Sequence, residues 1–326
     1  MTAAKHAEIS RGAEQDPRRD RPGARERGDG EVRRGRRAVR LTRLDLLFWP
    51  DEQIRKADLV EYYRAVAPTL LPHLRNRPFT FKRHYNGPRS PFEWSKDAPP
   101  ELPEWIPVAP LPAASRGGRP VRYVLVNDEL TLLWVLEFGC VDLHVWTSRV
   151  DRPERPDRVL FDLDAAGVGF HDVVRAAHLV RQALAGLGLE SVVKTTGGEG
   201  LHVEVPLERR RSHAQAREFA EVVAGALVRA HGDLVTTERS RERRRGVFVD
   251  TKMNGHGQQV VAPYSVRPRP GAPVAAPLAW DELDTDLDPR ELTMDVVLER
   301  VERHGDLHAS LLAGGQRLER ALAALA

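Results

Sequence analysis

Cysteine, methionine and aromatic residues are scarce in this sequence of 326 residues, which contains one cysteine, three methionines and 6% Phe, Trp and Tyr. A single cysteine, Cys140, excludes a disulfide bond within the chain and argues against a cysteine-based zinc site. No apolar stretch approaches the ~20 residues that span a bilayer, and the N-terminus lacks the apolar core of a secretory signal. We therefore expect a cytoplasmic protein without membrane contact, long enough for two modest domains or one large one.

The charge of the chain is unevenly distributed. Residues 1–40 contain 12 Lys and Arg against 7 Asp and Glu, so the remaining residues carry a net charge of −2 although the whole chain carries +3. A basic segment without hydrophobic periodicity predicts a disordered N-terminal tail over residues 1–40. Such a tail either attracts phosphates without specificity or is a solvated extension without function.

Beyond the tail, strand and helix patterns follow one another without a regular βαβ rhythm, which predicts an α+β fold with a mixed sheet. Helices are expected at 56–74, from an Asp172 cap to about 187, from a Ser212–Gln215 capping box to about 231, and at 294–303 and 309–325. Strands are expected at 78–85, 121–127, 130–138, 141–146, 190–194, 201–205, 247–250 and 258–266. The Pro-rich segment 86–120 predicts an irregular loop.

Two aspartates end an apolar run, Val159-Leu160-Phe161-Asp162-Leu163-Asp164. Alternate side chains of a strand share a face, so Asp162 and Asp164 project together while Leu163 points into the core. Carboxylates this close need a cation between them, and a divalent metal with oxygen ligands is the usual solution. A later apolar run ends in Asp250. Three strand-end carboxylates favour a two-metal site over the alternative of solvated strand ends.

A glycine-rich turn, Thr196-Gly197-Gly198-Glu199-Gly200-Leu201-His202, lies between these carboxylates in the sequence. Glycines let backbone N–H groups approach phosphate oxygens closely, and His202 would then face a triphosphate. A tight hairpin with a structural histidine is the alternative. The carboxylates and the turn together indicate metal-assisted phosphoryl chemistry.

Cationic and aromatic side chains accompany this pattern. Lys82 and His84 share one face of an expected strand, and Asp142, His144 and Trp146 share a face of another. An arginine-rich run at 239–245 precedes the Asp250 strand. These residues are either ordinary sheet and loop positions or the cations and stacking surface of a nucleic-acid groove.

In order, Phe161 to Asp164, Thr196 to His202 and Val247 to Asp250 resemble the three motifs of archaeo-eukaryotic primase-polymerases. The closer resemblance is to the polymerase domain of bacterial ATP-dependent DNA ligase D, which acts in non-homologous end joining. Flanking stretches extend the resemblance to roughly residues 41–312: Arg77-Pro78, Lys82-Arg83, Leu143-His144, Ala262-Pro263-Tyr264-Ser265 and Ala276 to Trp280. It implies mixed and antiparallel sheets flanked by helices, with the active site in the cleft between them.

The resemblance also implies roles for individual residues. Asp162, Asp164 and Asp250 would hold two manganese or magnesium ions, and Asp250 would help to activate the primer 3′-hydroxyl. The nucleotide would be bound by Lys82, His144, Thr196, Gly197, His202, Ser265 and Arg267. DNA would be contacted by Lys56, which matches a lysine for the 5′-phosphate at a gap or break, and by Phe92, Trp94 and Arg243.

Several positions depart from the family pattern. Glu199 stands where the family carries lysine and reverses a charge beside the phosphates, whereas Thr196 replaces serine and keeps the hydroxyl. Leu46 stands in place of a second lysine for the 5′-phosphate. The aromatic pair that stacks on the template is reduced to Phe92, with Trp94 as a substitute.

These features predict a template-directed nucleotidyltransferase that adds ribo- or deoxyribonucleotides to primer 3′ ends at DNA gaps or double-strand breaks. Residues 41–312 would form the primase-polymerase domain and 313–326 a helical end, which leaves no room for ligase or nuclease domains. We expect DNA and nucleoside triphosphates as substrates, a separate ligase and a Ku-type end-binding protein as partners, and a location at the nucleoid. The alternatives are a nucleic-acid-binding module with weakened catalysis, which Glu199 and Leu46 favour, and a metal-dependent phosphoesterase, which leaves the glycine–histidine motif unexplained.

Overall fold

The computed structural model describes residues 29–112 and 119–325. Its centre is a six-stranded sheet in the order β13-β14-β10-β12-β11-β16. The strands are β10 (Arg158–Ala166), β11 (Val192–Thr195), β12 (Gly200–Pro206), β13 (Val235–Thr236), β14 (Gly246–Asp250) and β16 (Pro277–Leu278). Only β13 and β14 pair in parallel within this sheet, and its other pairs are antiparallel. A mixed sheet among helices confirms the predicted α+β class.

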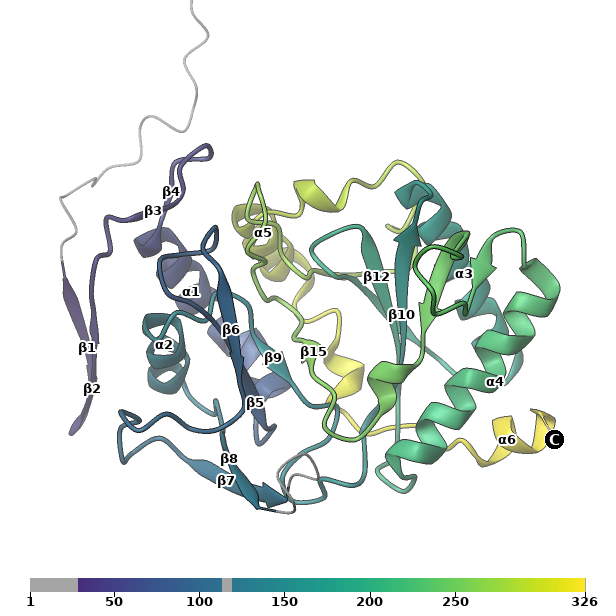
Figure 1. The fold of residues 1–326 in the computed structure, drawn as a ribbon, viewed down its shortest axis with the longest axis horizontal. Coiled ribbons are helices and arrows are strands. Elements are labelled where there is room, and N and C mark those ends of the chain that lie inside the picture. Colours follow the sequence, from purple (N-terminus) through teal and green to yellow (C-terminus); the bar gives the residue numbers. More distant parts are fainter. Residues whose placement is uncertain (1–28, 113–118, 326) are drawn as a thin grey trace, which may run out of the picture.

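Helices α3 (Phe170–Gly186) and α4 (His213–His231) cover one face of the central sheet (Figure 1). Val159, Phe161 and Leu163 of β10 are fully buried, as the period of two predicts for the face that packs on helices. Asp162 and Asp164 therefore project from the opposite face. Among the helices of the described residues, we find none with the length and apolar character to cross a membrane.

A second, four-stranded sheet in the order β15-β9-β5-β6 lies beside the open face of the first (Figure 1). Its strands are β5 (Phe79–His84), β6 (Phe92–Ser95), β9 (His144–Val145) and β15 (Val260–Val261), and it packs with α1 (Lys56–Leu74) and α2 (Glu129–Glu137). Tyr62 and Tyr63 of α1 tie this half together, because their buried hydroxyls donate to the carbonyls of Tyr264 and Val141.

Smaller elements complete the structure. Three two-stranded sheets are formed by β1 (Gly30–Arg34) with β2 (Arg37–Leu41), β3 (Leu47–Trp49) with β4 (Ile54–Arg55), and β7 (Val108–Pro112) with β8 (Pro120–Val124). The C-terminal part contains α5 (Met294–His304) and α6 (Glu319–Leu325). Short 3-10 turns occur at Lys252–Asn254, Pro289–Glu291 and Ala309–Leu311.

Several predicted elements are confirmed. Helix α1 has the predicted bounds, and the strands that carry Asp162, Asp164 and Asp250 are present. The Ser212–Gln215 capping box at α4 is also confirmed, because the Ser212 hydroxyl accepts from the Gln215 backbone N–H at 3.2 Å and the Gln215 side chain accepts from the Ser212 N–H at 3.0 Å. Local patterns specified these elements well.

The predicted strand at 130–138 is wrong, since these residues form helix α2. The Asp128 carboxylate caps this helix by accepting from the Thr131 backbone N–H at 2.8 Å. Leu130, Leu132, Leu133 and Val135 are all nearly fully buried. A helix buried on most sides loses the 3.6-residue alternation, so its apolar run resembled a buried strand.

The N-terminal and loop predictions also need correction. Residues 1–28 of the expected tail lie outside the described residues, but residues 30–40, expected to be disordered, belong to the hairpin β1–β2, where Val39 is buried and the Arg37 side chain binds Asp128 at 2.6 Å. The expected loop at 86–120 contains β6 and β7, which pair with the strands next to them in the sequence, β5 and β8. The prolines of this segment, two of them within β7, concealed these short strands.

Other boundaries differ from the predictions by smaller amounts. Helix α3 begins at Phe170 with Gly169 at its cap, and Asp172 lies in the first turn with its carboxylate paired to Arg175 at 3.0 Å. The strands expected at 141–146 and 258–266 shrink to two residues each, and the expected helix at 309–325 is divided into a 3-10 turn and α6. The predicted helical end at 313–326 is thus helical from Glu319 within its described part.

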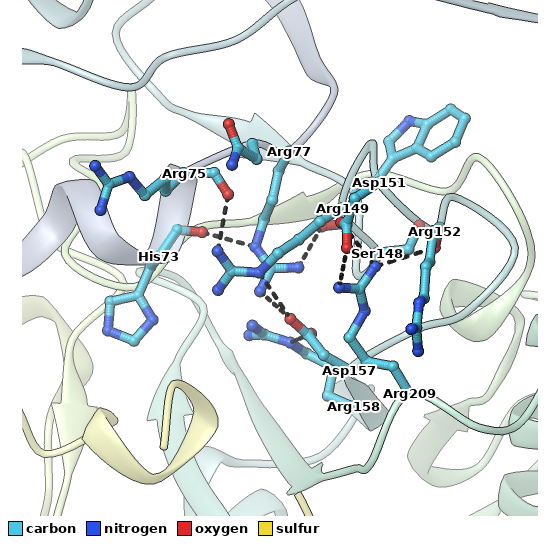
Figure 2. Close-up of polar contacts among 12 residues, drawn as sticks. His73, Arg75, Arg77, Ser148, Arg149, Asp151, Arg152, Asp157, Arg158 and Arg209 are labelled. Carbon is cyan, nitrogen blue, oxygen red and sulfur yellow. Dashed lines mark hydrogen bonds and ion pairs between the residues drawn. The ribbon is translucent and has the colours of Figure 1, made fainter. Parts of the chain in front are cut away.

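A buried arginine cluster fixes the start of β10 (Figure 2). Asp157 accepts from Arg77 and, at 3.0 Å, from Arg158, and it lies 3.5 Å from Arg149. Burial alone would raise the pKa of Asp157, but the charges of Arg77 and Arg158 hold it well below its usual range. The strand that carries the central carboxylates therefore begins at a charged, tightly bonded anchor.

Candidate active site

Four titratable residues lie in one row across neighbouring strands of the central sheet. Lys194 of β11 pairs with His202 of β12, His202 pairs with Asp162 of β10, and Asp162 pairs with Asp250 of β14. Directly opposite residues of neighbouring strands project from the same face, with Cβ atoms ~5 Å apart. The row therefore places a lysine, a histidine and two carboxylates side by side on the face that the helices leave open.

Asp164 lies two residues further along β10 on that same face. Its side chain keeps contact with solvent, but partial burial and then the negative charges of Asp162 and Asp250 raise its pKa to about 6. The Asp162 carboxylate lies 3.3 Å from the Nε2 atom of His202, and one oxygen of Asp250 accepts from the Lys252 backbone N–H at 2.8 Å. The three carboxylates thus carry more negative charge than nearby cations balance.

These carboxylates fit a hard divalent cation by their chemistry. Such an ion binds oxygen donors on one face and neutralises their charge, and the pKa of Asp164, raised by partial burial and then by repulsion from Asp162 and Asp250, is consistent with such a site. In residues 29–112 and 119–325, no three His, Cys, Asp or Glu side chains converge as a ready-made metal site. Because the carboxylates share a face and neighbouring registers, changes of side-chain rotamer would bring them together without a change of register.

The glycine turn lies next to this row. Gly197 has a φ of +66°, and a Cβ there would lie 2.3 Å from Cγ of Arg267, so only glycine fits this position. The Thr196 hydroxyl donates to the Gly200 carbonyl at 3.2 Å, and the Arg267 guanidinium donates to the Thr196 carbonyl at 3.1 Å. The turn is therefore held closely against Arg267.

A cleft of about 910 Å³ opens beside the turn. Asp164, Thr196 and Glu199 line it together with arginines from the loop before β14 and from the segment after β15: Arg241, Arg244, Arg245 and Arg269. The arginines give the cleft the cations that a polyphosphate needs. Glu199 is exposed at its edge and adds one opposing charge.

The second sheet contributes two of the residues predicted to bind the nucleotide, Lys82 of β5 and His144 of β9. Lys82 and His144 are buried and both bind the Asp142 carboxylate at 2.9 Å. Phe92 and Trp94 of the edge strand β6 are about half exposed; the Lys82 ammonium lies 4.6 Å from the Phe92 ring centre, and the Trp94 ring lies 4.9 Å from that of His144. The predicted cations and stacking aromatics are therefore neighbours.

Three predicted residues lie in other settings. Ser265 is fully buried, and its hydroxyl accepts from the Leu143 backbone N–H at 2.8 Å. Lys56 is also buried, with its ammonium bound to Glu137 at 2.6 Å and to the Thr42 carbonyl at 2.8 Å. Arg243 is largely exposed and pairs with Glu238 at 3.3 Å, whereas Arg241, Arg244 and Arg245 of the same loop line the cleft.

The sequence interpretation missed two buried charged residues on this face, Lys194 of the row and Glu204 of β12. Lys194 and Glu204 are fully buried, and Glu204 binds Arg158 at 2.7 Å. Burial lowers the pKa of Lys194 to about 8, and burial followed by the charge of Lys194 lowers that of His202. The period of two would have placed Lys194 beside Thr196 and Glu204 beside His202, but the cross-strand register had to be known first.

Comparisons with known proteins agree with this geometry. The family model described as LigD, primase-polymerase domain, matches residues 55–308. The multifunctional non-homologous end joining protein LigD of Mycolicibacterium smegmatis is 34% identical over 277 residues, which cover 84% of this chain and 36% of the relative. The bifunctional non-homologous end joining protein LigD of Bacillus subtilis is 28% identical over 270 residues, which cover 82% and 43%.

A solved structure of a LigD polymerase domain has the same fold as this chain. The polymerase domain from Mycobacterium tuberculosis ligase D in complex with DNA superposes with a TM-score of 0.79 at 34% identity, covering 85% of this chain and 99% of that chain. The predicted primase-type fold is confirmed by this match. The chain thus spans less than half of the length of each of the two LigD relatives named above.

Proposed function

The chain belongs to the LigD primase-polymerase domain family, and we propose from this premise that it is a metal-dependent nucleotidyltransferase. It adds ribo- or deoxyribonucleotides to primer 3′ ends at DNA gaps or double-strand breaks. The observation that carries the proposal is the row of His202, Asp162 and Asp250 beside the glycine turn, since it combines carboxylates and a phosphate-binding loop on one face. A Ku-type protein and a DNA ligase are the proposed partners in end joining.

Asp162, Asp164 and Asp250 would hold two manganese or magnesium ions, which neutralise charge as the α-phosphorus is attacked. In the reaction the primer 3′-oxygen forms a bond to the α-phosphorus, the bond to the bridging oxygen breaks, and pyrophosphate leaves. Asp250 stands at the end of β14, where its carboxylate can take the proton of the 3′-hydroxyl. Thr196, Gly197, His202 and Arg267 orient the triphosphate, and Lys82 and His144 hold the nucleotide from the other sheet.

Primer extension tests the proposal directly. The protein is incubated with a gapped duplex and manganese or magnesium, with either nucleoside or deoxynucleoside triphosphates. We expect extension that copies the template base and requires the metal. If DNA binds but no nucleotide is incorporated with either ion, the enzyme proposal fails. That outcome would favour a nucleic-acid-binding module, a candidate that Glu199 at the edge of the cleft supports.

Recognition of the 5′-phosphate is expected to be weak in this chain. The Lys56 ammonium is already bound to Glu137 and Thr42, its side chain is 9% exposed, and Leu46 supplies no charge. Binding to a gapped duplex should therefore change less than about twofold when the 5′-phosphate is removed, because a cation already neutralised by a neighbouring carboxylate attracts phosphate poorly. Fluorescence anisotropy with the two duplexes measures this ratio.

Glu137→Gln offers the complementary test. The change removes the charge that neutralises Lys56, so a preference for the 5′-phosphate of several-fold should appear. Glu129→Gln is a matched control, since Glu129 lies on the same helix and pairs with Arg34 and Arg64 instead. A strong phosphate preference in the unmodified protein would show that Lys56 leaves Glu137 when DNA binds.

A further inference from the structure

Asp142 is a buried carboxylate to which the sequence interpretation gave no role. It is fully buried, and its Oδ2 atom lies 2.9 Å from the Lys82 ammonium, 2.9 Å from Nε2 of His144 and 3.6 Å from Nε of Arg267. All three partners belong to the predicted nucleotide pocket. One carboxylate therefore gathers three nucleotide-binding side chains from two strands and a distant loop.

Bonds around Asp142 extend to the rest of the pocket. Arg267 also donates to the Thr196 carbonyl at 3.1 Å, which connects Asp142 to the glycine turn of the central sheet. The backbone N–H of Leu143, the next residue, donates to the hydroxyl of Ser265. Ser265 lies two residues before Arg267 in the sequence. Asp142 thus lies at the point where the nucleotide residues of the second sheet are joined to those of the first.

The carboxylate remains an anion at this buried position. Burial alone would raise the pKa of Asp142, but the hydrogen bond and charge of His144 and the charges of Arg267 and Lys82 hold it well below its usual range. The Oδ1 atom has no hydrogen-bond partner, and His84 Nε2, which also has none, lies 4.0 Å away. An anion with an unpaired buried oxygen is costly, so Lys82, Arg267 and the imidazole of His144 must hold it firmly.

We propose that Asp142 is the positioning residue of the nucleotide pocket, holding Lys82, His144 and Arg267 in the arrangement that receives the incoming nucleotide. Without a central anion, these donors would repel one another and lose their common orientation. The three side chains would then become ordered only when the nucleotide binds, and the entropy cost of that ordering would weaken nucleotide binding. This inference rests on the proposed nucleotidyl transfer and names a residue that acts through its three partners.

Asp142→Asn tests the proposal, because asparagine keeps the shape and removes the charge. We expect KM for the nucleotide to rise about tenfold while kcat at saturating nucleotide falls less than about threefold. The affinity for gapped DNA should not change. Asp157→Asn is the control, since Asp157 is also a buried carboxylate bound by arginines, about 16 Å along β10 from Asp162. It should lower the melting temperature and leave KM unchanged.

A double-mutant cycle with Lys82→Met separates positioning from a general loss of structure. Because Asp142 acts partly through Lys82, the double variant should raise KM by less than the product of the two single effects. Additive effects, or an unchanged KM in Asp142→Asn, would overturn the inference.

Should Asp142→Asn not fold, Arg267→Lys takes its place. Lysine keeps the positive charge but lacks the branched guanidinium that contacts both Asp142 and the Thr196 carbonyl. An unchanged KM in this variant would equally overturn the inference. If the unmodified protein itself incorporates no nucleotide, the proposed function fails instead.

Discussion

Asp162→Asn should lower the rate of primer extension by about a thousandfold or more. Asp162 lies at the centre of the row, opposite both His202 and Asp250, and its carboxylate is 3.3 Å from His202. Asparagine replaces an anionic oxygen by a neutral amide, so it binds a divalent cation poorly and no longer offers a carboxylate to His202. Single-turnover extension of a gapped duplex, at saturating nucleotide and manganese, measures the effect.

The same variant should fold at least as well as the unmodified protein. Burial, followed by the negative charges of Asp162 and Asp250, raises the pKa of Asp164 to about 6. Removing one of these charges relieves repulsion in the metal-free protein, so its melting temperature should not fall. DNA affinity should also stay the same, which separates loss of chemistry from loss of structure.

Asp172→Asn is a suitable control for Asp162→Asn. Asp172 lies in the first turn of α3, on the helix-covered side of the sheet, and pairs with Arg175. It should extend primers at the normal rate. Extension by Asp162→Asn within tenfold of the unmodified protein would show that the row does not perform the chemistry.

Glu204→Gln should destabilise the protein by about 3 kcal/mol, because it leaves buried cations without their anion. Glu204 is fully buried, binds Arg158 at 2.7 Å and faces His202 at 3.9 Å. Lys194 is a further buried neighbour whose charge Glu204 balances, whereas burial lowers the pKa of the neighbouring His308 to about 4. Thermal and urea unfolding measure the loss, which should be accompanied by a weaker affinity for nucleotide through His202.

The pH dependence of this loss has a definite sign. Burial alone would raise the pKa of Glu204, but Arg158 and the neighbouring cations lower it from 4.5 to about 2. A lowered carboxyl pKa stabilises the native state above the unfolded-state value, and this contribution disappears as the pH falls from 4.5 toward 2. The difference in stability between Glu204→Gln and the unmodified protein should therefore be full at pH 7 and shrink below pH 4.5.

Glu208→Gln provides the matched comparison. Glu208 pairs with Arg210 and Arg317 at the surface, where solvent screens the charges, and its removal should change the unfolding curve little. Equal melting temperatures for Glu204→Gln and the unmodified protein would show that Arg158 and Lys194 do not depend on Glu204.

Local sequence patterns predicted the parts of the site that depend on neighbouring residues. Alternation along 159–164 placed Asp162 and Asp164 on one face, and the glycines of 197–200 indicated a tight turn. The capping box at Ser212 was equally local. The resemblance then connected these pieces, and the family is confirmed.

Patterns of the same kind misled where a segment is buried on most sides or where a proline-rich stretch contains a short strand. Helix α2 lost its periodicity through burial, and β6 pairs with β5 across the loop 85–91. Lys56 remains the predicted phosphate-binding lysine, and only the structure shows that Glu137, 81 residues away, binds its ammonium. A local sequence pattern does not show which distant residue a side chain will contact in the fold.

The sequence by itself determined the three strand-end carboxylates, the glycine turn and the α+β class, because each follows from periodicities of two or 3.6 residues within one segment. Only the tertiary structure decided that Lys194, His202, Asp162 and Asp250 form one row and that Asp142 joins Lys82, His144 and Arg267. The physical reason is register. Pairing between strands tens of residues apart sets which charges meet in a buried, weakly screened space, and a shift of one residue would turn each side chain to the other face.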